Sequence, residues 1–369
     1  MSAEWTHTGY AQQIVFGSTS VRRIPELLRA AGARRVMLVT TAGRLGSDDG
    51  DRVVRAIGSM LGSTFADVAS HVPTNTVQAA HRQAREDGVD GLVSFGGGSC
   101  ADLAKAVAFF TEQEQGIPAT SWTDRPALPH VSVPTTYSGA ELTPFFGMTD
   151  PTTHTKTGAG GPTCAPVAAV YDPELTCSTP VDVSAQTGMN ALAHCVEAMW
   201  STRRTPEAEA LAVAGARRLA AALPLVVDDP DNLAVRASVL EGAVLAARCL
   251  QNAAMGVHHG LAQLIGGRTG IAHGLANAVL LAHCTRFNAD AVPDAVRRVG
   301  EAIGAPDDAA GAIAGLVDRL GIPPQLADAG VTLEDIDAVA RLAPSHGGIK
   351  QNPRPVGEDE AREILSAAY

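Results

Sequence analysis

Residues 89–110 of the chain read VDGLVSFGGGSCADLAKAVAFF and place a strand, a turn and a helix in direct succession. The run Val89–Phe95 is short and apolar, as expected for a strand that is buried on both faces of a parallel sheet. Gly96–Gly98 then allow a tight turn, and Ala101–Phe110 is apolar over the length of a helix. The stretch therefore predicts a parallel sheet with helices packed on its faces.

The same alternation of strand and helix patterns continues on both sides of this stretch. Further strands are expected at Val15–Gly17, Arg35–Thr40, Phe65–Val68, His130–Val133 and Val167–Tyr171, and helices at Val21–Ala31, Asp51–Leu61 and Val77–Asp87. Strands that alternate with helices favour a mostly parallel sheet. We therefore predict an α/β domain over residues 1–180, in which the segment from about 143 to 180 is an ordered loop with one strand.

Beyond residue 180 the pattern changes to long helices with almost no strand signal. Examples are Gln186–Ser201, Pro206–Ala222, Ala234–Cys249 and Asp294–Ile303. We predict an all-helical domain over residues 181–369, and we expect a ligand site in the cleft between the two domains. The length of 369 residues agrees with two domains of roughly 150 residues or more each.

Composition narrows the class of protein and of partner. Hydrophobic residues make up 46% of the chain, which excludes a disordered chain, and the 28 basic and 39 acidic residues give a net charge of −11, which disfavours nucleic acid and anionic membrane as partners. The six cysteines form no C-x-x-C pair, and the N-terminus lacks the pattern of a signal peptide. The longest uncharged stretch, Cys249–Gly267, is too polar to span a membrane. We expect a cytoplasmic protein with reduced cysteines.

The glycine turn is a candidate phosphate site. Gly96, Gly97, Gly98 and Ser99 lie between a predicted strand and a helix, where the backbone can approach a phosphate and the helix N–H groups face it. Asp102, in the first helical turn, is placed to hold either the loop or a ribose hydroxyl. The alternative is a glycine-rich turn without a ligand, since the spacing is not that of the G-x-G-x-x-G fingerprint.

Two other turns at strand ends carry polar residues. The hydroxyl-bearing residues Thr135, Thr136, Tyr137 and Ser138 follow a predicted strand and could line a pyrophosphate or a nicotinamide ring, or simply cap a helix. Thr41 stands where an NAD-specific site usually has an acidic residue that repels the 2′-phosphate of NADP. The threonine, with an arginine three residues later, permits both NADH and NADPH, unless this is a plain strand-to-helix turn.

Histidines and one asparagine form the other candidate site. Asn190 and His194 are four residues apart, which places them on one face of a helix. His258 and His259 are adjacent, and His273 follows 14 residues after His259. Three imidazoles and a carboxylate would suit Fe²⁺ or Zn²⁺, but here the fourth group is a neutral amide, which weakens the attraction for a cation.

Several motifs, taken in order, resemble maleylacetate reductase, within the wider group of iron-type alcohol dehydrogenases with a dehydroquinate-synthase-like fold. They are Pro134–Asp150 (PTTYSGAELTPFFGMTD), Lys156–Gly158, Val170–Thr176, Gly188–Glu197 (GMNALAHCVE) and Asn352–Val356 (NPRPV). The resemblance runs over nearly the whole chain. It implies that the glycine turn binds the dinucleotide pyrophosphate and that the Thr135 turn lines the nicotinamide.

The resemblance also assigns roles to single residues. Lys156 would lie near the nicotinamide, and the wider family binds its metal at the positions of Asn190, His194, His259 and His273. Maleylacetate reductases resemble this chain in having asparagine there and are thought to act without a metal.

Two positions complicate the assignment of the proton donor and of the substrate contacts. Many members of both groups have a second histidine where this chain has Gln263, which cannot deliver a proton near neutral pH. His258 or a water molecule would then deliver it. Arg248 is either a ligand for a substrate carboxylate or a surface arginine.

These observations predict an NAD(P)H-dependent reductase that converts maleylacetate to 3-oxoadipate in the degradation of aromatic compounds. His194, His259 and His273 would donate hydrogen bonds to a developing enolate, and Lys156 would hold a carboxylate of the small anionic substrate. One alternative is a metal-dependent alcohol dehydrogenase acting on a small alcohol or aldehyde. Another is a biosynthetic member of the scaffold with altered or lost redox chemistry. We expect a homodimer.

Overall fold

The computed structural model describes residues 4–118, 121, 126–152 and 156–369. The chain forms two compact units. The sheet unit comprises Gly9–Thr179, and the helical unit comprises Pro180–Tyr369 together with residues 4–8. Residues 4–8 are held by contacts such as the hydrogen bond of 2.7 Å from the Thr8 N–H to Asn252 Oδ1. The predicted domain boundary, which assigned residues 1–180 to the sheet unit, did not separate these first residues.

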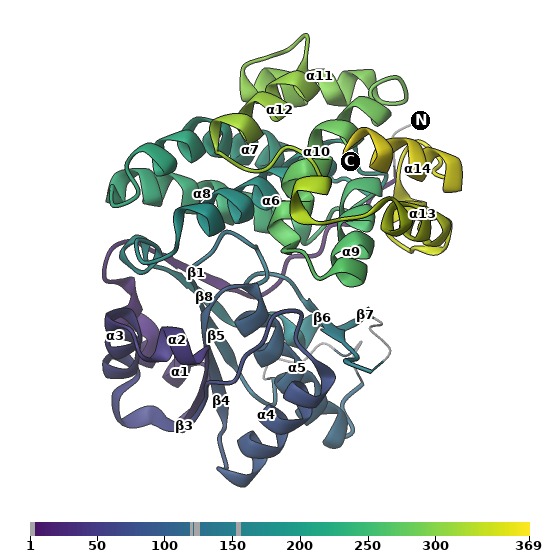
Figure 1. Ribbon diagram of the computed structural model, residues 1–369. Helices are drawn as coiled ribbons and strands as arrows, with labels where there is room; N and C mark the ends of the chain where they lie inside the picture. Colours follow the sequence, from purple (N-terminus) through teal and green to yellow (C-terminus); the bar gives the residue numbers. More distant parts are fainter. Residues whose placement is uncertain (1–3, 119–120, 122–125, 153–155) are drawn as a thin grey trace. The chain divides into compact units, whose positions relative to one another are not determined.

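The sheet unit is built on six parallel strands in the order β1-β8-β5-β4-β2-β3 (Figure 1). Their bounds are Gln13–Phe16 (β1), Val36–Val39 (β2), Leu61–Phe65 (β3), Gly91–Gly96 (β4), His130–Pro134 (β5) and Ala168–Tyr171 (β8). The predicted parallel α/β class is confirmed. The third strand was misplaced, because Leu61–Phe65 contains Gly62 and Ser63 and therefore lacks a continuous apolar run.

Helices cover both faces of this sheet. On one face lie α1 (Ile24–Ala30) and α3 (Asp48–Ile57), and on the other lie α4 (Thr74–Glu86) and α5 (Gly98–Glu114) (Figure 1). Strand β2 shows why: Val36 and Leu38 enter the first core, whereas Met37 and Val39 enter the second. A strand buried on both faces is an unbroken apolar run, which is the signal that the sequence carries.

The sheet unit also contains an antiparallel pair that the sequence did not predict. Strands β6 (Phe145–Thr149) and β7 (Lys156–Gly160) pair with each other within the segment expected to be a loop. Only Phe146 among the residues of β6 is fully buried, so the segment lacks the apolar run that identified the larger strands.

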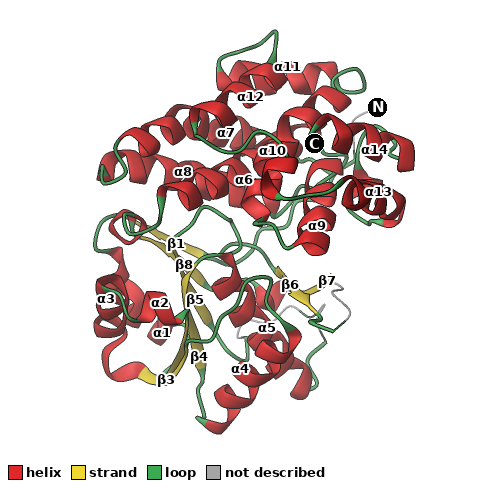
Figure 2. Cartoon of the chain, in the orientation of Figure 1, coloured by secondary structure: helices red, strands yellow, loops and turns green. Residues whose placement is uncertain are grey.

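The second unit is helical, as the sequence predicts. Its helices are α6 (Val181–Trp200), α7 (Pro206–Asp228), α8 (Leu233–Leu250), α9 (Val257–Thr269), α10 (His273–Asn288), α11 (Pro293–Ile303), α12 (Ala309–Arg319), α13 (Leu333–Leu342) and α14 (Glu358–Ala367) (Figure 2). Helix α6 packs against α7, α8 and α10. Every residue from Gly188 to Trp200 is therefore buried, which explains why most of this stretch is apolar.

Among the described residues, one helix has the length and apolar composition of a membrane span, namely α7. The helix packs against α6, α8 and α11, and it carries the charged pairs Glu207 and Glu209 near its start and Arg217 and Arg218 in its middle. Length and composition alone are weak evidence for a span. The packing accounts for the apolar residues of α7 as part of a helix bundle.

Candidate active site

The carboxyl ends of three neighbouring strands bring the predicted cofactor residues together. Strands β2, β4 and β5 are adjacent in the sheet, and Thr41, Gly96 and Thr135 lie at or just after their ends. The chain leaves β2 toward α3 on one face, and it leaves β4 toward α5 on the other. In open parallel sheets this reversal of direction opens a crevice at the strand ends, where ligands bind.

The glycine turn approaches the next loop so closely that side chains would not fit. A Cβ atom added to Gly98 would lie 2.9 Å from Ser138 Oγ, and one added to Gly97 would lie 3.3 Å from Thr136 Cγ2. Gly96 has a φ of 140°, which L-residues rarely adopt. Gly96 is the last residue of β4, Gly97 is the N-cap residue of α5, and Gly98 is the first residue of the helix. Backbone N–H groups at such a helix start suit a phosphate.

The loop after β5 presents hydroxyl groups beside the glycine turn. The Thr135 N–H donates to Gly96 O at 2.9 Å, which ties the two segments together. The hydroxyl groups of Thr135 and Thr136 are buried and have no hydrogen-bond partner among the described residues. Buried hydroxyls normally find a partner, so these two fit a cofactor that supplies one. Tyr137 is buried and Ser138 half-buried next to them.

The carboxylate of Asp102 bonds to Lys105 and to the backbone of Gly147 in β6. One carboxylate oxygen lies 2.8 Å from Nζ of Lys105, and the other accepts the Gly147 N–H at 3.3 Å. Lys105 is fully buried, and its ammonium also donates to Ala140 O at 2.8 Å and to Thr143 Oγ1 at 2.9 Å. Of the two roles considered for Asp102, these contacts favour holding the loop. Sequence reasoning missed Lys105, although a charged pair three residues apart in an apolar helix was a visible signal.

The polar groups of the turn after β2 form hydrogen bonds within the sheet unit. Thr41 caps the short helix α2 (Ala42–Leu45) by accepting the Arg44 N–H at 3.2 Å. The guanidinium of Arg44 donates to Ser178 Oγ at 2.6 Å and to Thr179 Oγ1 at 2.7 Å. Burial lowers the pKa of Arg44. No acidic side chain stands at position 41 to repel a 2′-phosphate.

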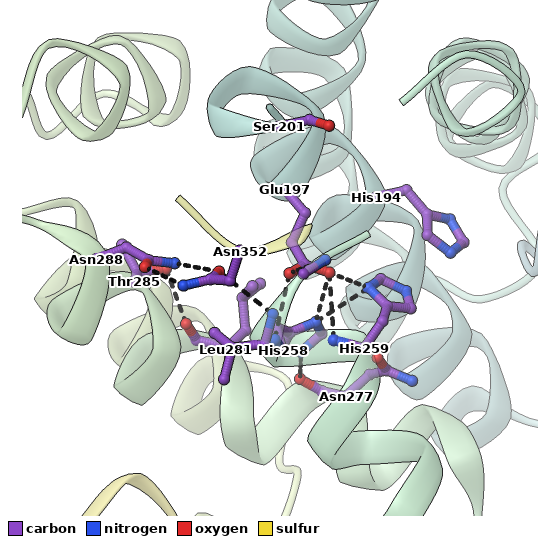
Figure 3. A network of polar contacts seen from close by, with 12 residues as sticks. His194, Glu197, Ser201, His258, His259, Asn277, Leu281, Thr285, Asn288 and Asn352 are labelled. Carbon is purple, nitrogen blue, oxygen red and sulfur yellow. Dashed lines mark hydrogen bonds and ion pairs between the residues drawn. The ribbon is translucent and has the colours of Figure 1, made fainter. Parts of the chain in front are cut away.

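The helical unit gathers the three predicted imidazoles. The rings of His194 on α6 and His259 on α9 are stacked, with centroids 4.6 Å apart and planes inclined by 15° (Figure 3). His273, the first residue of α10, has its ring centroid 6.3 Å from that of His259. Asn190 lies buried on α6, one helical turn before His194. Residues far apart in sequence therefore form one cluster. We call it the histidine cluster, and it consists of Asn190, His194, His259 and His273.

Burial and neighbouring rings decide the charge of His194. Its pKa lies well below the ordinary value, because burial disfavours the charged ring and because His259 and His273 add positive charge nearby. His194 is therefore neutral at pH 7. Its Nδ1 atom is buried without a hydrogen-bond partner among the described residues, so this nitrogen suits a ligand.

The sequence analysis did not single out Glu197, which is fully buried directly beside the cluster (Figure 3). Burial opposes ionisation of this carboxyl, but hydrogen bonds from His258 and His259 outweigh it, and the pKa falls well below its ordinary value. The signal was present, because Glu197 follows His194 by three residues on an otherwise apolar helix. An acidic residue in such a helix needs partners inside the protein.

The remaining predicted site residues differ in their surroundings. His258 is fully buried, with Nε2 at 2.8 Å from Asn277 O and Nδ1 at 3.2 Å from His259 Nδ1, and this enclosure argues against its delivering a proton to a substrate. Arg248 forms an ion pair of 3.2 Å with Glu207, which favours its interpretation as a surface arginine. Gln263 is half-buried on α9. The side chain of Lys156 lies outside what the structure describes.

Two groups of side chains among the described residues come into question as ligands of a divalent cation. Glu197, His258 and His259 have ligand atoms within 4.8 Å of one another, but the Glu197 oxygens already accept N–H groups of the protein. The imidazoles of His194, His259 and His273 remain, with Asn190 nearby on α6. This donor set is neutral, so it fits a cation less well than one with a carboxylate.

Comparison with known proteins agrees with this arrangement. The model for "Iron-containing alcohol dehydrogenase" matches residues 11–173, and the model for "Fe-containing alcohol dehydrogenase family, C-terminal" matches residues 184–369. The chain belongs to the iron-containing alcohol dehydrogenase family. It is thus an oxidoreductase, and the predicted two-part fold of this family is confirmed.

Within this family the chain is similar to maleylacetate reductases. It is 34% identical to the maleylacetate reductase of Rhizobium sp. strain MTP-10005 over 99% of this chain and 97% of that protein. The crystal structure of the Rhizobium enzyme superposes with a TM-score of 0.88 and covers 100% of this chain and 99% of that one, at 33% identity. Sulfoacetaldehyde reductase from Bifidobacterium kashiwanohense in complex with NAD⁺ superposes with a TM-score of 0.89 at 26% identity, covering 100% of this chain and 99% of that one.

Proposed function

We propose that this family member is an NAD(P)H-dependent maleylacetate reductase, which reduces the carbon–carbon double bond of maleylacetate to give 3-oxoadipate in the degradation of aromatic compounds. The observation that carries the proposal is the similarity to maleylacetate reductases over the full length of the chain. Asn190 in the histidine cluster supports it, because a neutral amide suits a reductase that needs no metal.

We propose that the sheet unit binds the cofactor, which supplies the hydride when bound. The N-terminal turn of α5 would bind the pyrophosphate through backbone N–H groups. The buried hydroxyls of Thr135 and Thr136 would donate or accept hydrogen bonds beside it. A threonine at position 41 opposes neither NADH nor NADPH, so we propose that both are used. A solved family member bound to NAD⁺ supports this class of cofactor.

The helical unit would stabilise the charge that develops on the substrate. Hydride addition to the alkene carbon moves negative charge onto the conjugated keto oxygen, which becomes an enolate. His194 is neutral and would donate one N–H to that oxygen without carrying a charge, and His273 would contribute a further N–H group. His259, whose Nδ1 faces Glu197, would instead hold a water molecule through Nε2. A proton then reaches the neighbouring carbon from a histidine or a water molecule. The enclosure of His258 makes it the weakest of these donors.

The substrate carries two carboxylates, which need cationic or N–H partners once water is removed. We propose that Lys156, on strand β7, binds one of them. Arg248 is a weaker candidate, because its guanidinium already pairs with Glu207. The acidic balance of the whole chain means that such positive charge must be local.

A second candidate function is a metal-dependent alcohol dehydrogenase acting on a small alcohol or aldehyde. The gathering of His194, His259 and His273 favours it, since three imidazoles are a common ligand set. A cation held there would polarise a substrate oxygen. The neutral Asn190 disfavours it. A third candidate is a biosynthetic member of the scaffold with altered or lost redox chemistry. Gln263 supports it, because glutamine cannot deliver a proton as a histidine at this position could.

The test mixes the purified protein with maleylacetate and either NADH or NADPH and follows the absorbance of the reduced nicotinamide. We expect oxidation of cofactor at the same rate with and without chelator, and no stoichiometric metal by elemental analysis. Activity on small alcohols that depends on bound metal would favour the second candidate. Cofactor binding without oxidation by maleylacetate would favour the third.

We further propose a homodimer in the cytoplasm. Six free cysteines, five of them buried, are consistent with a reducing compartment. Symmetric dimers are common among soluble enzymes. Light scattering after size-exclusion chromatography measures the mass directly, and a mass equal to that of one chain would contradict the dimer.

A further inference from the structure

The carboxylate of Glu197 accepts four hydrogen bonds from the N-terminal turn of α9. Its Oε1 atom accepts the N–H groups of Gly256 at 2.9 Å and His258 at 3.2 Å. Its Oε2 atom accepts the His259 N–H at 3.2 Å and lies 2.6 Å from Nδ1 of the His259 ring (Figure 3). A simple helix cap accepts one or two backbone N–H groups. Here a single buried side chain bonds both the turn and the ring that the turn carries.

A second side chain completes the same turn. Asn352 Oδ1 accepts the Val257 N–H at 3.3 Å, so the N–H groups of residues 256 to 259 all have side-chain acceptors. Asn352 is itself fixed by Asn288, whose Oδ1 atom accepts from Asn352 Nδ2 at 2.8 Å. The start of α9 is therefore held from two sides, which fixes the direction in which His259 leaves the helix.

These contacts also determine which nitrogen of His259 carries hydrogen. A carboxylate oxygen surrounded by N–H groups acts only as an acceptor, so the ring nitrogen that faces it, Nδ1, must be the donor. In the neutral ring the lone pair is then on Nε2. The neighbouring His258 does not compete for this role, because its Nδ1 lies 3.7 Å from the same carboxylate oxygen and its Nε2 contacts Asn277 O.

We propose that Glu197 is a positioning residue that fixes both the orientation and the tautomer of His259, so that Nε2 is the nitrogen presented to the reacting molecule. The orientation and tautomer of the ring follow from its contacts with Glu197. Only the identity of the molecule that meets Nε2 rests on the proposed reductase function. The contribution to activity comes from the hydrogen bond to Nδ1. The three backbone hydrogen bonds stabilise the helix start.

The test compares the wild-type protein with Glu197→Gln. Glutamine has nearly the same shape, and its one carbonyl oxygen can still accept from Gly256 and His258. With that oxygen kept on the two backbone N–H groups, the amide group replaces Oε2, so the His259 N–H loses its acceptor. The amide then donates to Nδ1, which must become an acceptor, and the ring must change to the Nε2–H tautomer. ¹⁵N chemical shifts of labelled histidine distinguish the two tautomers, and a His259→Asn variant identifies the signal.

We expect the Nδ1–H tautomer in the wild type and the Nε2–H tautomer in Glu197→Gln. With maleylacetate and NADH, kcat should fall by about 10- to 100-fold, the range typical when the partner of a functional histidine is lost. KM for NADH should change by about twofold or less, because the cofactor residues lie in the other unit. Glu112→Gln is the matched control, since Glu112 is also a buried carboxylate but lies on α5, far along the chain. It should change neither the His259 signal nor kcat.

Either of two results overturns the proposal. One is an Nε2–H tautomer in the wild type. This measurement needs no variant, so it remains possible even if Glu197→Gln does not fold. The other is a tautomer change in Glu197→Gln with wild-type kcat. Metal analysis of each preparation separates a change in ring geometry from a change in metal content. Absence of any cofactor oxidation by the wild type would contradict the proposed function, and the wild-type tautomer would still test the role of Glu197.

Discussion

Replacement of Lys105 by methionine tests how the segment after β5 is held in place. The Lys105 ammonium is completely buried and lies within 3 Å of four oxygens, namely Asp102 Oδ1, Ala140 O, Thr143 Oγ1 and Phe145 O. Methionine has a similar length and fills the space, but it donates no hydrogen bond. The substitution therefore removes the positive charge and leaves four oxygens without their shared donor.

The structure allows an estimate of the cost. Removing one partner of a buried ion pair destabilises a protein by about 3–5 kcal/mol. The Asp102 side chain is 25% exposed, so water can partly solvate the carboxylate that is left. We therefore expect a loss near the lower end, about 3 kcal/mol in the free energy of unfolding. The double variant with Asp102→Asn should lose less than the sum of the two single variants, with a coupling energy of about 1 kcal/mol or more.

Urea unfolding followed by circular dichroism measures these free energies, with each transition fitted separately because two units need not unfold together. Cofactor affinity, measured by nicotinamide fluorescence, should also fall, since the held segment continues the loop of Thr135 and Thr136. A loss below about 1 kcal/mol for Lys105→Met, or costs that simply add, would refute the reasoning.

Three further predictions concern the sheet unit. Thr41→Asp should raise KM for NADPH about tenfold or more while sparing NADH, because a carboxylate at the end of β2 repels the 2′-phosphate and can still cap α2; equal effects on both cofactors would contradict this. Gly98→Ala should weaken NADH binding about tenfold, because its Cβ would lie 2.9 Å from Ser138 Oγ, and Ser138→Gly in the same chain should restore much of the loss; titration calorimetry measures both. Burial and the nearby ammonium lower the pKa of His130 to about 3, so below pH 6.5 the unfolded chain binds a proton that the folded chain does not. Stability should therefore fall from pH 6.5 toward 3, and less steeply in His130→Asn, as chemical unfolding at several pH values would reveal.

The parts of the fold that the sequence predicted correctly are those with strong local patterns. Strand β2 is an unbroken apolar run because helices cover both its faces, and α6 is mostly apolar because helices surround it. Strands β3 and β6 were misplaced or missed, since each contains glycine and has few buried residues. Strand β3 is held in the sheet by its pairing with β2, so its position depends on tertiary contacts and not on its local pattern alone.

In the candidate site, too, the residues with a local sequence signal were predicted and residues that depend on distant partners were missed. Spacing and residue type were enough to select His194, His259 and His273, which do gather in space. Glu197 and Lys105 were not found, because their partners include His259, which is 62 positions from Glu197, and Ala140, which is 35 positions from Lys105. A charged residue inside an apolar helix was a signal that a buried partner exists, but the sequence could not say which.

The chain enters the sheet unit at Gly9 and leaves it at Thr179, while residues 4–8 pack with the helices that follow. In order of synthesis the sheet unit is thus an insertion within a discontinuous helical unit. All six strands of its sheet have been made by residue 171, so it has what it needs to fold early. The first residues, by contrast, must wait for partners such as Asn252. Expression of residues 181–369 alone would lack that N-terminal piece, so a faithful isolated helical unit would have to be joined to it by an engineered linker.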